Sequence, residues 1–332
     1  MKISVDGGAL NPKNSQRFGT AIFSKNLVKA LQLYDNKNQY YIYTFDNLKP
    51  KLFWMKGRVS LEEFKQKKEV FLALNQALPL YVSGKIISFC HGLSYYFYPQ
   101  YYSKKDVIRL NSQLKEMIKR SDSIIVSSEK IKKELIGINR LIDTKIVFLP
   151  FGIPLDMNNR NIKNQRSNSK ERRKYFIFVA NNQPIKNIKF ILQSFNRLKC
   201  DDKYKKYKLL LVGDWKKYEN KKLGIVSFSN ITREKLKKLY QGATALLTAS
   251  HYESFNFPVL EALSQGCPVI GLKSAIIPEL KPYVNVANNL NEFVNLMKSS
   301  INKSFNLTAV RQARLYSRFN WQNYVKNLVK LY

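Results

Sequence analysis

The chain has 332 residues, 45% of them hydrophobic, and its 57 lysines and arginines against 23 aspartates and glutamates give a net charge of +34 at pH 7. This length favours two domains of ordinary size, each with its own core. No apolar run approaches the length of a membrane span, the N-terminus shows no signal-peptide pattern, and the three cysteines lack the spacing of disulfides or a zinc site. We therefore expect a cytoplasmic protein.

The first half of the chain alternates between strand-like and helix-like segments. Strands are predicted at residues 2–6, 39–45, 85–90, 123–127 and 145–149, and helices at 21–33, 107–119 and 129–136. Such alternation is typical of parallel sheets covered by helices. A polar and charged run without apolar periodicity follows at 158–173, and it predicts a linker.

The second half repeats this alternation. Strands are predicted at 175–180, 208–213, 224–227, 243–249 and 268–272, and helices at 188–198, 233–240, 259–265 and 290–299, with two more that break near Asn320. We predict an α/β fold of two doubly wound, Rossmann-like domains, 1–157 and 174–315, that face a central cleft. The C-terminal helix, 316–332, is expected to pack back on the N-terminal domain.

Two carboxylates flank a predicted strand-to-helix turn in the segment E-S-F-N-F-P-V-L-E. Glu253 lies in the loop after a buried strand, and Glu261 follows eight residues later, in the first turn of a helix that Pro258 begins. Both can face the crevice at the carboxyl ends of the strands, where open α/β sheets bind ligands. The pattern suits a polar ligand that carries several hydroxyl groups and a phosphate.

This segment, with the E-A-L-S-Q-G-C-P-V-I that continues it, closely resembles the signature of the group 1 glycosyltransferases, retaining enzymes of the GT-B fold. The resemblance implies that Glu253 holds donor-sugar hydroxyls and that Glu261 accepts the ribose hydroxyls of the nucleotide, since carboxylates accept hydroxyl pairs well. It also implies that the backbone N–H groups of Asn256 and Phe257 point at the diphosphate. The family prefers glycine where Ser254 and Asn256 stand, which leaves donor identity and turnover open.

A second match to the family is F-V-A-N-N-Q-P-I-K-N at 178–187. The family has a strand here and then a loop that ends E-P-R-K-N, so Lys186 falls on a phosphate-binding lysine. A lysine that faces a departing nucleoside diphosphate stabilises the charge that develops as the glycosidic bond breaks. Asn181 stands where the family often has arginine. The alternative for Lys186 is one more surface lysine.

A third match is C-H-G-L-S-Y-Y-F-Y-P-Q-Y-Y-S at 90–103, which resembles the strand-end H-D-L and Y-P-E-Y-F-S-like run of mannosyltransferase-like members. It implies that His91 lies under the donor sugar, near the acceptor hydroxyl. Gly92 replaces the family's aspartate, and a histidine satisfied in the core is the alternative. A weaker fourth match, at 17–31, keeps Gly19 of a loop that approaches the phosphates and the acceptor.

Together these matches imply a retaining hexosyltransferase that moves a sugar from a nucleotide-diphosphate sugar to a hydroxyl acceptor, in polysaccharide, lipopolysaccharide or glycolipid synthesis. The implied catalytic residues are His91, Lys186 and Glu253, and the implied donor-binding residues are Gly19, Asn181, Ser254, Phe255, Asn256, Phe257 and Glu261. No metal ligands cluster in the sequence, so we expect no cofactor and no obligatory metal. The alternatives are a non-catalytic nucleotide-sugar or glycan-binding protein and a sugar-nucleotide epimerase of the same fold.

The high positive charge indicates attraction to a polyanion. Because the basic residues are spread along both halves, nucleic acid is the weaker hypothesis, and peripheral contact with the anionic inner face of a membrane is favoured over it. The expected partners are therefore a nucleotide-sugar donor, a glycan or lipid-linked acceptor, and an anionic membrane surface.

Overall fold

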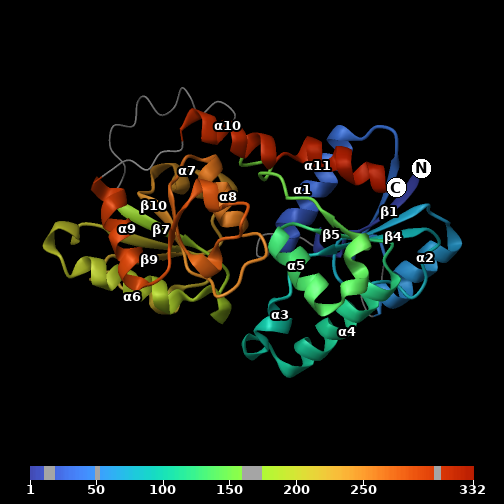
Figure 1. Cartoon of the computed structure of the whole chain (residues 1–332), viewed down its shortest axis with the longest axis horizontal. Helices are drawn as coiled ribbons and strands as arrows, with labels where there is room; N and C mark the ends of the chain where they lie inside the picture. The colour runs from blue at the N-terminus through green and yellow to red at the C-terminus, as the bar shows by residue number, and fades with distance from the viewer. Residues whose placement is uncertain (11–18, 49–52, 159–173, 303–307) are drawn as a thin grey trace. The chain divides into compact units, whose positions relative to one another are not determined.

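The computed structural model describes residues 1–10, 19–48, 53–158, 174–302 and 308–332, and it divides into two compact units (Figure 1). The first unit contains Met1–Gly152 and Phe319–Tyr332, and the second contains Ile153–Arg318. The division therefore falls after Gly152, slightly before the predicted boundary at residue 157. The predicted linker, 158–173, lies almost wholly outside the described residues.

The first unit is built on a parallel sheet of six strands in the order β2-β1-β3-β4-β5-β6. The strands are β1 (Lys2–Asp6), β2 (Gln39–Tyr43), β3 (Val70–Ala73), β4 (Lys85–Cys90), β5 (Ser123–Val126) and β6 (Ile146–Phe148). The helices are α1 (Gly19–Tyr34), α2 (Ser60–Lys65), α3 (Ser94–Phe97), α4 (Lys104–Arg120), α5 (Glu129–Ile138) and α11 (Trp321–Leu328). The sequence pattern does not predict β3, which lies between β1 and β4. All four of its residues are buried, so it lacks the alternation that marks a strand with one solvated face.

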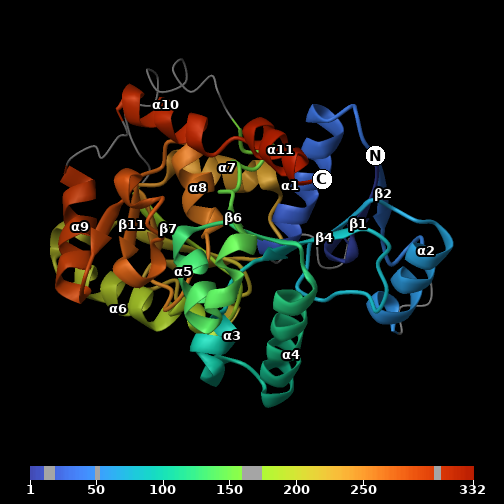
Figure 2. The same ribbon diagram turned by 45° about the vertical axis from the view of Figure 1, so that its right-hand side comes forward.

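The last helix of the chain, α11, packs on α1 within the first unit (Figures 1 and 2). It begins after Asn320, whose side-chain oxygen accepts the N–H groups of Gln322 and Asn323 at 2.8 and 3.2 Å. This cap separates α11 from α10 (Ala309–Arg318), as the sequence predicted. Gly152 lies against the Trp321 ring, where an added Cβ would approach to 2.5 Å. The close approach of backbone to ring therefore requires glycine at 152.

The second unit is also a parallel sheet of six strands, in the order β12-β11-β10-β7-β8-β9. The strands are β7 (Tyr175–Val179), β8 (Lys208–Val212), β9 (Ile225–Phe228), β10 (Ala245–Thr248), β11 (Val269–Leu272) and β12 (Asn285–Ala287). The helices besides α10 are α6 (Ile188–Lys199), α7 (Arg233–Gly242), α8 (Phe257–Ser264) and α9 (Leu290–Asn302). The sequence pattern does not predict the short edge strand β12, which pairs with β11.

The core of the second unit follows from the alternation of side chains along its strands. Phe178 and Leu211 point to one face of the sheet, where Phe195 of α6 and Phe293 of α9 cover them. Strand residues whose side chains point to the other face, such as Leu246, are equally buried. Helices α7 and α8 pack against each other as a separate pair (Figure 1). A sheet buried on both faces leaves only its edges and strand ends for a ligand, and parallel order gathers the carboxyl ends at one edge.

Candidate active site

Two loops of the second unit meet at the carboxyl edge of its sheet. The 3₁₀ turn Pro184–Lys186 follows β7, and the loop from residue 249 follows β10, the strand that pairs with β7. His251 N–H donates to the Ile185 carbonyl at 2.9 Å, and the Asn187 side chain donates to the Ala249 carbonyl at 3.1 Å. The Lys186 ammonium donates to Glu253 Oε1 at 2.8 Å. Two motifs that lie 67 residues apart in the sequence thus form one hydrogen-bonded site.

The Lys186–Glu253 ion pair is largely shielded from solvent. The side chains are 21% and 11% exposed, and Glu253 Oε1 also accepts the Ser250 hydroxyl at 2.7 Å. An ammonium group has three N–H donors, so the contact with Glu253 leaves donors for an anion at the mouth of the site. The structure therefore brings together two of the three predicted catalytic residues.

Asn256 keeps the backbone conformation that glycine favours. Its φ of 70° lies in the left-handed region, where asparagine is the best tolerated residue after glycine. Its side-chain amide turns inward and donates to Thr248 Oγ1 at 3.2 Å and to the Ala275 carbonyl at 3.1 Å. Ser254 has no positive φ. The asparagine that departs from the family's glycine therefore braces the loop against β10 and the segment after β11.

The two phenylalanines of the motif anchor the same loop. Phe255 and Phe257 are 2% and 5% exposed, and their ring centroids lie 5.2 Å apart in an edge-to-face arrangement. Phe257 is the first residue of α8, one position earlier than predicted. Glu261 consequently lies in the second turn of α8 and not in the first, which corrects the prediction.

Glu261 is held by two residues that the sequence interpretation missed. Its Oε1 accepts Arg233 Nη2 at 2.7 Å, and its Oε2 accepts the Tyr240 hydroxyl at 3.2 Å. The Arg233 guanidinium also bonds Asp156, at 2.8 and 3.1 Å. Burial raises the pKa of the Glu261 carboxyl, and the Arg233 charge opposes that rise. Arg233 and Tyr240 are seven residues apart, which places them on one face of α7. This spacing is the feature of the sequence that could have indicated that the two side chains act together.

Asn181 lies in the loop after β7, beside the turn that carries Lys186. Its Oδ1 is buried and has no hydrogen-bond partner among the described residues. A buried polar oxygen is normally satisfied, so an unpaired one at the carboxyl edge of a sheet marks a place for a water or a ligand group. Eight of the ten predicted site residues lie in this second unit.

His91 and Gly19 belong to the first unit. His91 follows β4, and its Nε2 lies 2.7 Å from the Leu74 carbonyl, so we assign the ring proton to Nε2. The ring packs on Phe23 and Phe151, at centroid distances of 4.9 and 5.9 Å. Burial lowers the pKa of His91 to about 4, so the imidazole is neutral at pH 7. Gly19 is the exposed first residue of α1, and residues 11–18 of its predicted loop lie outside the described residues.

A buried aspartate at the carboxyl edge of the first sheet is a further candidate that sequence interpretation missed. Asp6 ends β1 and accepts the Gly8 N–H at 2.9 Å, together with the backbone and side-chain N–H groups of Asn75 at 3.1 and 2.9 Å. Burial raises the pKa of its carboxyl. Asp6, Asn75 and His91 follow the adjacent strands β1, β3 and β4, so parallel order brings them to one edge.

Neither a metal site nor a membrane-spanning helix is found in the described ranges. Across these residues, no three histidine, cysteine, aspartate or glutamate side chains gather closely enough to hold a metal ion. None of the described helices combines the length and apolar character that a membrane span requires.

Comparison with solved structures defines the class of fold. A sucrose-phosphate synthase from Thermosynechococcus elongatus superposes with a TM-score of 0.74 at 16% identity, over 100% of this chain and 98% of that one. Anabaena HepE in complex with UDP-glucose superposes with a TM-score of 0.69 at 13% identity, over 100% and 99% of the two chains. Two six-stranded parallel sheets and these neighbours confirm the predicted GT-B fold.

Comparison of sequences shows which family the second half of the chain is similar to. Residues 159–285 match the family model described as glycosyl transferases group 1. The O-antigen chain mannosyltransferase B of Escherichia coli is 23% identical over 278 residues, which cover 78% of this chain and 72% of that protein. Residues 159–285 are therefore similar to the glycosyltransferase group 1 family, and the predicted resemblance is confirmed.

Proposed function

We propose that the protein is a retaining hexosyltransferase that moves a sugar from a nucleotide-diphosphate sugar to a hydroxyl acceptor in polysaccharide, lipopolysaccharide or glycolipid synthesis. The observation that carries the proposal is the cluster of Lys186, Glu253 and Ser250 at the carboxyl edge of the second sheet. The UDP-glucose bound by Anabaena HepE and the O-antigen role of the E. coli relative support the donor and acceptor classes.

In the proposed reaction the bond between the anomeric carbon and the leaving diphosphate breaks while the acceptor oxygen bonds to the same face of the sugar. The acceptor proton passes to an oxygen of the leaving diphosphate. Lys186 stabilises the charge that develops on that diphosphate, because its ammonium lies in a shielded site where electrostatic attraction is stronger than in water. Glu253, whose Oε1 accepts Lys186 and Ser250, holds sugar hydroxyls in this proposal, since a carboxylate accepts several hydrogen bonds.

Asn181 and His91 take hydrogen-bonding roles in this proposal. The unpaired Oδ1 of Asn181 accepts a donor hydroxyl or an ordered water. His91 is neutral at pH 7, so it offers the unprotonated Nδ1 as a hydrogen-bond acceptor and does not contribute positive charge. Glu261 accepts the ribose hydroxyls, since each of its oxygens has a second lone pair beyond the one that Arg233 or Tyr240 uses.

We propose that transfer needs no bound metal, because Lys186 and the N-terminus of α8 supply the positive potential that the diphosphate requires. The expected result is that transfer continues after dialysis against excess EDTA and is not raised by added Mg²⁺ or Mn²⁺. Loss of transfer on chelation, with recovery on adding one of these ions, would contradict this part of the proposal. We also propose a cytoplasmic location with peripheral contact at the anionic inner face of the membrane.

The test of the main proposal is a mass-spectrometric screen of nucleotide sugars with and without candidate glycan and lipid-linked acceptors. We expect transfer or slow donor hydrolysis with one donor, and a loss of roughly 100-fold in Lys186→Ala and in Glu253→Ala, comparable to removal of one group that stabilises transition-state charge. Lys189→Ala removes an exposed lysine from the neighbouring helix and serves as the matched control. Wild-type rates in both site variants would defeat the proposal.

The same screen separates the alternatives. Thermal stabilisation by a nucleotide sugar without any product would indicate a non-catalytic binding protein. Gly92, Ser254 and Asn256, which replace the family's residues, motivate this alternative. A changed free sugar nucleotide that forms without an acceptor would indicate an epimerase.

A further inference from the structure

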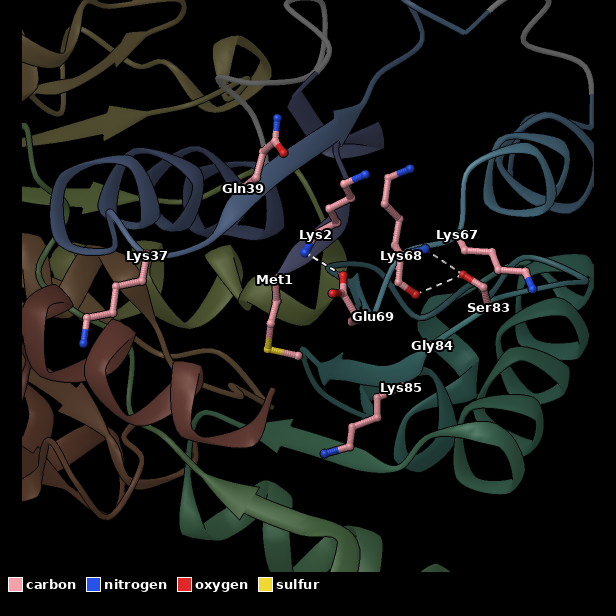
Figure 3. A pocket seen from close by; sticks show the side chains of 10 residues that line it. All are labelled: Met1, Lys2, Lys37, Gln39, Lys67, Lys68, Glu69, Ser83, Gly84 and Lys85. Atoms are coloured by element: carbon pink, nitrogen blue, oxygen red, sulfur yellow. Dashed lines mark hydrogen bonds between the residues drawn. The ribbon is translucent and has the colours of Figure 1, made fainter.

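The first unit contains a pocket of about 980 Å³ at the amino ends of its strands. Lys2 and Lys85 begin β1 and β4, Gln39 begins β2, and Lys68 lies just before β3 (Figure 3). In a parallel sheet this is the edge opposite the carboxyl ends, where Asp6, Asn75 and His91 lie. The pocket is therefore separate from the candidate residues for sugar transfer in this unit.

Positive charge dominates the lining. Five lysines contribute to it, namely Lys2, Lys37, Lys67, Lys68 and Lys85, against one carboxylate, Glu69. Glu69 is already engaged, because its Oε2 accepts the backbone N–H of Lys2 at 2.6 Å. Within the described parts of the chain, none of these five lysines forms an ion pair, whereas Lys56 and Lys65 of the same unit do.

Hydrogen bonds hold together the segments that form the floor of the pocket. Ser83 Oγ accepts the Lys68 N–H at 2.8 Å and donates to the Lys68 carbonyl at 3.0 Å. Lys85 N–H donates to the Glu69 carbonyl at 2.9 Å, and a Cβ on Gly84 would approach that carbonyl oxygen to 2.1 Å. Glycine at 84 is thus needed for the two chain segments to lie so close. Figure 3 shows the lysine side chains arranged around this braced floor.

Lys68 is the buried lysine of the set, while the exposed Lys85 ammonium donates to the Tyr332 backbone oxygen at 3.3 Å. Lys68 is 4% exposed, and its ammonium lies 4.4 Å from the centre of the Tyr41 ring and donates to the Gln66 carbonyl at 2.8 Å. Burial lowers its pKa most, the charge of Glu63 opposes that shift, and the charge of Lys2 lowers the pKa further. Ammonium groups that line one pocket repel one another, and an anion placed between them would reduce that repulsion.

We propose that this pocket binds a ligand that carries two or more phosphate groups, supplied either by a free polyphosphate or by the headgroups of anionic lipids. Lysine binds phosphate as a point charge, and several lysines around one hollow match several phosphate groups. The volume is within the range of ligand pockets and far exceeds that of one small anion. The inference does not depend on the proposed sugar transfer.

The experiment compares two triple variants of the whole chain. Lys2→Gln/Lys67→Gln/Lys85→Gln removes three exposed ammonium groups from the pocket and leaves the buried Lys68 in place. The control has the same change in net charge and removes three exposed lysines of the second unit: Lys206→Gln/Lys221→Gln/Lys222→Gln. A cooperative thermal unfolding transition in each variant establishes that both are folded.

Two probes distinguish the sources of phosphate. Isothermal titration with tripolyphosphate in about 0.1 M KCl, where charges are screened beyond about 10 Å, measures the free anion. Co-sedimentation with vesicles of phosphatidylcholine and phosphatidylglycerol, against vesicles of phosphatidylcholine alone, measures the lipid headgroup. The expected result is a loss of roughly tenfold or more in affinity for at least one probe in the pocket variant, with the control near wild type.

The affected probe identifies the source, since weaker titration alone points to a free polyphosphate and weaker sedimentation alone points to lipid. If the pocket variant and the control respond alike to both probes, the attraction belongs to the overall charge and the proposed site is wrong.

Discussion

Glu261 is 2% exposed and shares its carboxylate between a guanidinium and a phenolic hydroxyl. A buried carboxylate without such partners is strongly disfavoured in its charged form. Arg233 supplies the positive charge and Tyr240 a hydrogen bond, while burial and the Glu261 charge raise the pKa of the Tyr240 hydroxyl well above its usual range. The network therefore stabilises a carboxylate at a position where apolar burial alone would protonate it.

Replacement of Arg233 by methionine leaves this carboxylate buried without its cation. We expect Arg233→Met to lower the free energy of unfolding at pH 7 by about 2 kcal/mol, below the usual cost of breaking a buried pair because the Arg233 side chain is 35% exposed. Urea unfolding measures the change. Arg109→Met, which breaks the exposed pair with Asp106, is the control and is expected to change stability by less than about 0.5 kcal/mol.

The pH dependence of the Arg233→Met effect has a definite sign. Loss of the cation raises the pKa of Glu261 further in the folded state, so the protonated carboxyl forms more readily there. The difference in stability between wild type and variant should therefore shrink as the pH falls below 7. A difference that stays constant or grows toward low pH would show that the charge of Glu261 is not the cause.

His91 gives a second prediction, which concerns how stability depends on pH. The sign of this dependence is opposite to that expected for an ion-paired histidine. The pKa of His91 is about 4 in the folded protein and about 6.5 in an unfolded chain, so between these values the unfolded state binds more protons. Its contribution to stability is complete above about pH 6.5 and is lost as the pH falls toward 4. Urea unfolding of wild type and His91→Gln from pH 7.5 to 4.5 should show a smaller loss in the variant, and parallel curves would contradict the assignment.

At the scale of elements, the last helix of the chain completes the first unit. Four residues of α11 are almost fully buried, with Trp321 and Tyr324 packed on Phe23 of α1. The cap at Asn320 and the close approach of Gly152 fix where this helix begins and how near it lies. A helix far along the sequence thereby becomes part of the core built by the first 152 residues.

Truncation of Trp321 should therefore loosen the first unit. We expect Trp321→Ala to cost about 3 kcal/mol, the low end for removing a buried aromatic ring, because the indole N–H has no hydrogen-bond partner to lose among the described residues. Hydrogen exchange should rise in α1 and α11 and remain unchanged in the strands of the second unit. Val310→Ala, at a 62% exposed position of α10, is the control, and an equal rise in both units would contradict the assignment of α11 to the first.

At the scale of the whole molecule, the net charge of +34 is the dominant long-range term. A charge so far from zero opposes the compact state through self-repulsion, and salt screens that repulsion over about 10 Å at 0.1 M. Part of this positive charge is concentrated in one small region. The five lysines that line the pocket at the amino ends of the first sheet repel one another there.

We therefore expect the thermal unfolding temperature to rise when KCl is increased from about 0.02 to about 0.3 M, by a few degrees. Differential scanning fluorimetry measures the shift, and an equal osmolality of sucrose serves as the control. Part of the rise should disappear in Lys2→Gln/Lys67→Gln/Lys85→Gln. A fall in the unfolding temperature with salt would mean that screened ion pairs outweigh the self-repulsion.

Local sequence patterns determined much of this protein. Alternating strand and helix periods predicted two doubly wound units and a break near Asn320. The strand-to-helix pattern placed Glu253 in a loop after a strand, and the family resemblance placed Lys186 in another. These features depend on a few neighbouring residues, so they can be recognised without knowing what lies nearby in space. The fully buried strand β3 was not predicted, because its sequence does not alternate between apolar and polar residues.

Only the tertiary structure decided which of these residues meet. The order of strands sets β7 beside β10 and so pairs Lys186 with Glu253, and the packing of α7 on α8 brings Arg233 and Tyr240 to Glu261. The same order gathers five lysines at the amino edge of the first sheet from four separate stretches of the chain. Contacts of this kind depend on sheet order and helix packing, which spacing along the chain does not specify, and they set the charge around each candidate site.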